Sequence, residues 1–136
     1  MSIFKFCAVC DEVRLEKSSN KSIIIGFYGM LPYVEVDVPN PSQPVQKLTF
    51  LFISGTPIAA GRYRVQVSIK DTNGLELADQ GVPAINEEAI AGPLNVIITV
   101  QPMPLNGPGN YRVTAIVNDK EDFTADFVVG QAPAAQ

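Results

Sequence analysis

The sequence feature that most constrains the fold is the absence of helical periodicity, combined with dense glycine and proline punctuation. The 10 glycines and 11 prolines are spread along the whole chain, and both residue types interrupt regular elements. The runs between them are short and rich in Val, Ile, Phe, Tyr and Thr, which is typical of β-strands. The best helical candidate, Asn86–Ala91, covers only about one and a half turns before Gly92-Pro93. The chain is therefore expected to be all-β.

Nine runs are predicted to be strands. Apolar and polar residues alternate most clearly in Arg62–Lys70, as expected for an antiparallel strand with one face against a core. The Asn73-Gly74 pair that follows it is expected to supply the positive-φ residues of a tight hairpin turn. The predicted strands are Ile3–Val9, Lys21–Tyr28, Tyr33–Val38, Leu48–Ser54, Arg62–Lys70, Leu75–Ala78, Leu94–Gln101, Tyr111–Asn118 and Phe123–Val129.

Length and loop composition favour one antiparallel β-sandwich of about eight or nine strands, with almost no helix. A chain of 136 residues is the size of a single domain. We expect that domain over residues 1–130, followed by a frayed tail over residues 131–136. Two proline-rich segments, Pro39–Pro44 and Pro102–Gly109, cannot pair in ladders, so they are predicted to cross between sheets or hairpins.

Two predicted strands begin with the same motif. GRYRV at Gly61 and GNYRV at Gly109 share Gly, Tyr, Arg and Val, which predicts an inward Tyr63 and an inward Tyr111 near the strand starts. The second copy follows a long loop and precedes a final hairpin. That arrangement resembles the end of immunoglobulin-like sandwiches, where a corner tyrosine bonds back to the loop. The resemblance implies an immunoglobulin-like architecture, here without Trp and with both cysteines near the N-terminus.

A second resemblance covers nearly the whole chain. The segment CDEVRLEKSSNKSIIIGFYGMLPY, residues 10–33, together with the strands and the terminal G-x-Y hairpin, resembles a family of small bacterial β-sandwich proteins of uncharacterised function. The resemblance implies the fold and a bacterial source. It implies no activity, cofactor or site residue.

The two cysteines are predicted to be small apolar strand residues. Cys7 and Cys10 are spaced C-A-V-C, and residues three apart on a strand point to opposite faces at about 10 Å, too far for a disulfide. A zinc site would lack its other ligands, because the chain has no His and no further Cys. Free thiols, and the lack of a signal-like or membrane-length apolar run, favour a soluble cytoplasmic protein.

Charge and composition exclude several function classes. The net charge of −4 argues against nucleic acid and anionic membranes as partners, since phosphate binding needs a basic face. The absence of His removes every His-based catalytic triad. The serines in EKSSNKS and the adjacent carboxylate pairs at residues 11–12, 87–88 and 121–122 are expected in turns or in solvent. We therefore expect no enzyme activity and no cofactor.

Calcium or glycan binding is the alternative to a protein-binding role. Clustered oxygens in DTNG and NDKED could hold calcium, although the two loops would lie at opposite ends of neighbouring antiparallel strands. Glycan binding would need an exposed aromatic platform, for which Tyr28 and Tyr33 are the candidates. The calcium candidates are Asp71, Asn73, Asn118, Asp119, Glu121 and Asp122.

Apolar residues on both faces of two strands favour a partner. A sandwich strand has one wet face and should alternate, yet Ile23–Tyr28 and Leu48–Ile53 are apolar on both. Something must cover the second face, and we expect a second copy of the chain or another protein. The alternative cover is the pair of proline-rich segments. The predicted partner-binding residues are Ile24, Phe27, Tyr28, Leu51 and Ile53.

Overall fold

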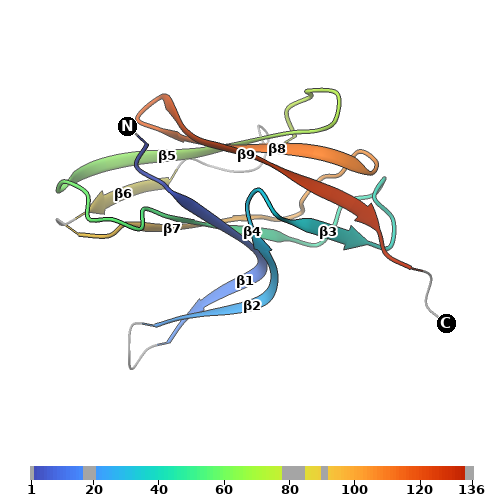
Figure 1. Cartoon of the computed structure of the whole chain (residues 1–136), viewed down its shortest axis with the longest axis horizontal. Helices are drawn as coiled ribbons and strands as arrows, with labels where there is room; N and C mark the ends of the chain where they lie inside the picture. The colour runs from blue at the N-terminus through green and yellow to red at the C-terminus, as the bar shows by residue number, and fades with distance from the viewer. Residues whose placement is uncertain (1, 17–20, 78–84, 90–91, 134–136) are drawn as a thin grey trace.

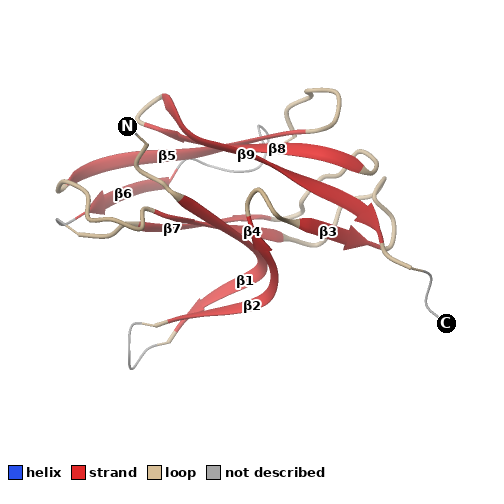
Figure 2. Ribbon diagram, in the orientation of Figure 1, coloured by secondary structure: helices blue, strands red, loops and turns tan. Residues whose placement is uncertain are grey.

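In the residues that it describes, the computed structural model of the chain is all-β, with nine strands in two sheets (Figure 1; Figure 2). It describes residues 2–16, 21–77, 85–89 and 92–133. In that part of the chain, no helix is long and apolar enough to cross a membrane. The strands are β1 (Phe6–Leu15), β2 (Ser22–Met30), β3 (Glu35–Val38), β4 (Leu48–Ile53), β5 (Gly61–Lys70), β6 (Ile85–Ala89), β7 (Asn95–Val100), β8 (Gly109–Val117) and β9 (Lys120–Gln131).

The strands form a four-stranded and a five-stranded sheet. The first, sheet A, has the order β2-β1-β4-β7 and is antiparallel throughout. The second, sheet B, has the order β3-β9-β8-β5-β6, in which only the β3–β9 pair is parallel. Aromatic rings join the two sheets: Phe50 lies 6.0 Å from Phe127, and Phe52 lies 6.1 Å from Phe123, between ring centroids. The two layers therefore share one core, as in a β-sandwich.

Most predicted strands occur, with shifted ends. β1 begins three residues later than predicted and runs six residues further, to Leu15, because its second half pairs with β2 in a hairpin. The strand predicted at Leu75–Ala78 is wrong for its described residues, 75–77, which contribute only an isolated bridge between Glu76 and Lys70. β6 is not among the predicted strands, and it overlaps the segment that was the best helical candidate, Asn86–Ala91.

The turn after β5 follows the predicted position with a different backbone. Gly74 has a positive φ of 80°, whereas Asn73 does not. The expectation of two positive-φ residues is therefore wrong. The side chain of Asp71 stabilises this turn without a second positive-φ residue. Its Oδ1 atom accepts hydrogen bonds from the backbone N–H groups of Asn73 and Leu75, both at 2.9 Å. Such a carboxylate-capped turn is typical of Asp.

Both proline-rich segments cross between the sheets, as predicted. The first leads from β3 in sheet B to β4 in sheet A, and the second leads from β7 in sheet A to β8 in sheet B. They pair with each other through a bridge between Val45 and Met103. Met103 and Leu105 are buried in the core between the sheets. The segments thus close one end of that core.

The two G-x-Y motifs occupy equivalent positions at the starts of β5 and β8, which are neighbouring antiparallel strands. The hydroxyl of Tyr111 donates to the carbonyl of Gly107 at 2.7 Å and accepts from the backbone N–H of Asn106 at 2.6 Å. The hydroxyl of Tyr63 donates to the carbonyl of Ala59 at 2.5 Å. Each tyrosine therefore bonds back four residues, and the prediction of an inward corner tyrosine is confirmed for Tyr111, which is fully buried.

The C-terminal end of β9 is longer than predicted. Gln131 pairs with Val38 in β3, and the N–H of Ala132 donates to the carbonyl of Val38 at 2.8 Å. The first two residues of the predicted tail are therefore hydrogen-bonded. Residues 134–136 lie outside the described part of the chain.

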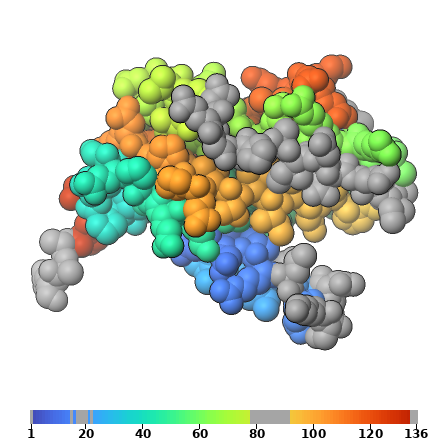
Figure 3. Space-filling view, turned by 180° about the vertical axis from the view of Figure 1, so that it is seen from behind, coloured from blue at the N-terminus to red at the C-terminus, as the bar shows by residue number. Residues whose placement is uncertain are grey.

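The distal part of the β1–β2 hairpin projects from the body of the sandwich (Figure 1; Figure 3). The pairing of β1 with β2 changes register between Val9 and Cys10, where β2 carries Tyr28 as an extra residue. A bulge of this kind bends and twists a strand pair. Gly26 lies just beyond it with a φ of 66°, a backbone that glycine adopts without strain. The bulge and this glycine mark where the hairpin leaves the plane of sheet A.

Candidate functional site

The outer side of sheet A, the side away from sheet B, is apolar across its central strands. Leu48, Phe50 and Phe52 belong to the core between the sheets, so alternation places Thr49, Leu51 and Ile53 on the outer side. Residues directly opposite on neighbouring strands share a face. The partners of this outer row in β1 are Cys10, Ala8 and Phe6 respectively.

The same face continues onto β2. Phe27 pairs with Cys10, and Ile25 and Ile23 pair with Glu12 and Arg14 further along β1. Because side chains two apart on a strand share a face, these three apolar β2 residues follow the outer side of sheet A. Ile24 pairs with Val13 and points to the opposite side of the hairpin. β2 is thus apolar on both faces, as its sequence predicted.

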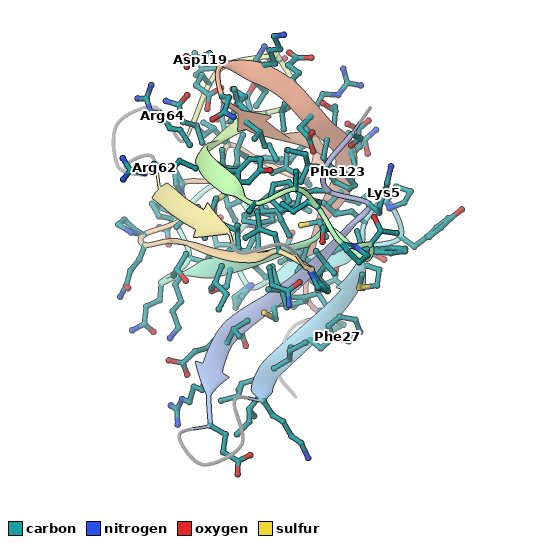
Figure 4. All side chains as sticks on the ribbon, turned by 90° about the vertical axis from the view of Figure 1, so that its left-hand side faces the viewer. Lys5, Phe27, Arg62, Arg64, Asp119 and Phe123 are labelled. Carbon is teal, nitrogen blue, oxygen red and sulfur yellow. The ribbon has the colours of Figure 1, made fainter. Side chains whose placement is uncertain are left out.

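Four β2 side chains remain exposed in the single chain. The exposed fraction is 56% for Phe27, 47% for Ile23, 41% for Ile24 and 38% for Ile25. We call these four residues the apolar hairpin patch. Figure 4 shows Phe27 on β2, away from the packed layers. Ile23, Ile25 and Phe27 are neighbours on the outer face, and Ile24 lies on the opposite face of the same hairpin. Monomers expose single apolar residues routinely, whereas a contiguous group of large ones marks an interaction site.

The predicted partner-binding residues divide into exposed and covered groups. Ile24 and Phe27 lie in the apolar hairpin patch. Leu51 is 5% exposed and Ile53 is partly buried, so neither belongs to the exposed patch. Tyr28 is partly buried, and its hydroxyl donates to Asp11 Oδ1 at 2.9 Å. Burial and then the Asp11 carboxylate raise the pKa of Tyr28 to about 12.

Sequence reasoning missed three residues on this side of the molecule. Ile23 and Ile25 belong to the patch, and Phe6, on the same outer face, is 51% exposed. The uninterrupted run Ile23-Ile24-Ile25 was the available signal, since a strand directs its first and third residues to the face opposite the second. The predicted residues Ile24 and Phe27 lie on opposite faces of β2, so the prediction included both faces but omitted Ile23 and Ile25.

The charged residues beside the patch are paired with each other. The Glu12 carboxylate lies 3.0 Å from Arg14 Nε and 3.3 Å from Lys47 Nζ. The hydrogen bond from Lys47, followed by that from Arg14, lowers the pKa of Glu12. These paired charges border an apolar surface that itself contains no charged residue.

The cysteines are free and buried. Burial, followed by the nearby Cys10, raises the pKa of the Cys7 thiol, and burial also raises that of Cys10. A thiol held protonated in this way is a poor nucleophile. The prediction of two small buried strand residues is confirmed.

The oxygens of the two acidic loops already hold backbone groups. Asp122 accepts hydrogen bonds from the backbone N–H groups of Ile3 at 2.7 Å and Phe4 at 2.8 Å. Asn118 Oδ1 accepts from the N–H of Arg64 at 2.9 Å, and Asp119 lies 3.5 Å from that guanidinium (Figure 4). Among the described residues, no group of three or more metal-ligating acidic, Cys or His side chains could hold an ion. The loops also follow opposite ends of β5 and β8, as expected.

The carboxylate of Asp71 makes the stability of the fold depend on pH. Its Oδ2 accepts from Asn106 Nδ2 at 2.8 Å, in addition to the two turn N–H groups. The bond from Asn106, then those from Leu75 and Asn73, lower the pKa of Asp71 below its ordinary value. A carboxylate with a lowered native pKa stabilises the fold above its unfolded-state pKa, near 3.9, and loses that contribution as the pH falls through the native value.

We therefore expect the stability difference between wild type and Asp71→Asn to be constant above about pH 5 and to shrink on acidification below about pH 4. Urea unfolding at neutral and acidic pH would measure this difference. Asn106→Ala should reduce the pH dependence, because it removes the largest cause of the lowered pKa. A wild-type–variant difference that does not change with pH would contradict this role of Asp71.

The outer side of sheet B carries a hollow of about 510 Å³. Polar groups line it in rows across β5, β8 and β9, and two pairs of them are hydrogen-bonded to each other. Thr114 and Thr124 share a hydrogen bond at 3.2 Å, and Ser68 donates to Glu76. The lining contains no aromatic residue; it comprises Gln66, Val67, Ser68, Lys70, Glu76, Arg112, Thr114, Ile116, Glu121 and Thr124. The glycan candidate Tyr33 is 88% exposed and lies elsewhere.

Comparison with protein-family models gives one match of high coverage. The model of a family of unknown function, DUF6941, matches residues 5–130. The chain belongs to the DUF6941 family. The match spans every strand from β1 to β8 and all of β9 except Gln131, so it covers both sheets of the DUF6941 chain.

The other comparisons add no activity. No curated protein matches the DUF6941 chain. A solved structure, the Pseudomonas fluorescens alkylpurine DNA glycosylase AlkC bound to DNA containing an abasic site analog, is 20% identical with a TM-score of 0.37. The aligned part covers 72% of the DUF6941 chain and 29% of the glycosylase. A TM-score this low does not establish a shared fold, and the glycosylase activity remains a property of that protein.

Proposed function

We propose that this protein is a non-enzymatic binding or assembly module that acts through the apolar hairpin patch of sheet A. The observation that carries the proposal is the exposure of Ile23, Ile24, Ile25 and Phe27 on one projecting hairpin. Covering these side chains with another protein surface would remove apolar area from water, which is the main favourable term in association. The ligand of the module is therefore a polypeptide.

Two observations support an external cover. One of the two proline-rich segments that could have covered this face, Pro102–Gly109, instead packs Met103 and Leu105 into the core between the sheets. The charged neighbours Glu12, Arg14 and Lys47 are paired along one side of the patch. An apolar centre with a polar border is the usual anatomy of a protein–protein interface.

Site-specific photocrosslinking in cells of the source organism would test the proposal. A photoreactive phenylalanine analogue at position 27 should yield covalent adducts with protein, which mass spectrometry can identify. The matched control carries the analogue at Tyr33, which is 88% exposed and outside the patch. Adducts that depend on position 27 support the proposal, whereas equal or absent adduct formation at the two positions would contradict it.

The proposal extends to the topology of the sandwich, the source of the protein and its location in the cell. We infer that the sandwich is immunoglobulin-like, and Tyr111 supports this by bonding back to Gly107 at the start of the penultimate strand. The bacterial source suggested by the sequence resemblance, and a cytoplasmic location suited to the free thiols of Cys7 and Cys10, complete this view of the module.

A further inference from the structure

We propose that the occupant of the apolar hairpin patch is a second copy of the chain, with the two β2 strands paired antiparallel about a two-fold axis at Ile24. This inference rests on the proposed function and specifies its partner. The pairing would join two copies of sheet A, each with the order β2-β1-β4-β7, edge to edge. Such an interface places the same surface on both subunits, as two-fold symmetry requires.

β2 is the least protected sheet edge of the molecule. An exposed edge strand can template pairing with another chain unless charges, prolines or bulges block it. No charged residue and no proline lies within Ser22–Met30. In the described part of the chain, β2 has a hydrogen-bonded neighbour, β1, on one side only. Its regular part, Ser22–Ile25, precedes both the bulge and Gly26.

The other three edges carry features that oppose pairing. β3, at one edge of sheet B, has four residues and exposes Glu35 and Asp37. β6, at the other edge, contains Glu87 and Glu88 in its sequence. β7, the second edge of sheet A, likewise has no charged residue or proline within the strand, but its exposed side chains, Asn95 and Thr99, are polar, and Pro93 and Pro102 flank it. Among the edge strands whose side chains are described, β2 is therefore the one that combines an uncharged edge with large exposed apolar side chains.

An axis at Ile24 matches apolar residues on both faces. Antiparallel pairing about this residue sets Ile24 opposite its symmetry mate, and Ile23 opposite Ile25 of the second copy. Opposed side chains lie about 4.5–5.5 Å apart at Cβ, so both faces of the new strand pair would bury isoleucine against isoleucine. Edge-to-edge pairing would therefore cover both apolar sides of β2, whereas contact through one sheet face would cover only one of them.

The area involved predicts a weak, concentration-dependent dimer. The four patch residues expose on the order of 400 Å² in the single chain, given the surface of full-size aliphatic and aromatic side chains. A standard interface buries about 800 Å² per partner, and the remainder would have to come from the β2 backbone and the flanks of the hairpin. Interfaces at the small end of this range belong to transient complexes.

Disulfide trapping in the full chain tests the pairing and its register. Opposed antiparallel residues have Cα atoms about 4.5–5.5 Å apart, within the range of a disulfide. Under mild oxidation, Ile24→Cys should form covalent dimer about tenfold faster than Tyr33→Cys, because pre-assembly raises the effective thiol concentration. The native cysteines are buried and give little background, which the oxidised wild type measures directly.

Mixing two variants of different tag size fixes the strand direction. Antiparallel pairing opposes position 23 to position 25, so Ile23→Cys mixed with Ile25→Cys should give mainly the mixed dimer. Position 23 and its own symmetry mate are diagonal, at about 7–8 Å, beyond easy disulfide reach. Predominance of the two self-dimers would overturn the antiparallel pairing.

The self-pairing fails if Ile24→Cys forms no more dimer than Tyr33→Cys. If position 27 still gives photoadducts with a different protein, the proposed function stands and only its partner is wrong. If position 27 gives no specific adduct either, the proposed function fails as well. Circular dichroism of each reduced variant checks that the substitution leaves the all-β fold intact.

Discussion

Replacing Tyr111 with alanine is expected to destabilise the protein by about 3–5 kcal/mol, the range for removing a large buried aromatic side chain. The ring is fully buried and stacks on Phe127 at 5.7 Å between centroids. Its hydroxyl also ties the loop before β8 through Gly107 and Asn106. Urea unfolding followed by circular dichroism would measure the change in the free energy of unfolding.

Tyr111→Phe separates the ring from the hydroxyl. It keeps the buried ring and should cost about 1 kcal/mol, the usual worth of a hydrogen bond. Tyr63→Phe is the matched control, because the Tyr63 hydroxyl makes the equivalent bond to Ala59 at an exposed position, where the loss should be smaller. Equal, negligible losses from Tyr111→Ala and Tyr111→Phe would show that the corner contributes nothing to stability.

The fold could be predicted wherever local pattern and tertiary environment agree. The alternation in Arg62–Lys70 reflects one buried face, and the structure places β5 there from Gly61 to Lys70. β6 could not be found in the same way. Its sequence, INEEA, lacks β-forming residues beyond Ile85, and pairing with β5 over five residues overrides that local preference.

The candidate surface was predictable in outline but not in detail. Two-sided apolarity in β2 and β4 identified sheet A as the site. It could not separate exposed from covered positions, because that depends on where the hairpin leaves the sheet. The bulge at Tyr28 and the register change between Val9 and Cys10 are not visible as a sequence pattern. In the structure Leu51 is buried, whereas Ile23 and Ile25 are exposed.

Substitution by alanine should change the free energy of unfolding by very different amounts at two phenylalanines of sheet A. Phe52 is fully buried and contacts three other rings, those of Phe4, Phe50 and Phe123, with centroids 5.5–6.5 Å away. Phe52→Ala should therefore cost about 3–5 kcal/mol of unfolding free energy. Phe27 is 56% exposed, so Phe27→Ala should change the stability of the single chain by about 0.5 kcal/mol or less.

Comparing Phe52→Ala with Phe27→Ala separates effects on the stability of the fold from effects on binding at the apolar hairpin patch. Chemical denaturation at low protein concentration measures the unfolding free energy of the single chain. Adduct formation from a photoreactive analogue at position 25 measures binding at the apolar hairpin patch. Phe27→Ala should weaken the second readout and leave the first nearly unchanged, because its ring lies on the surface. If Phe27→Ala instead destabilised the single chain as much as Phe52→Ala, the ring would belong to the core of the fold, and the exposed patch would lose its largest member.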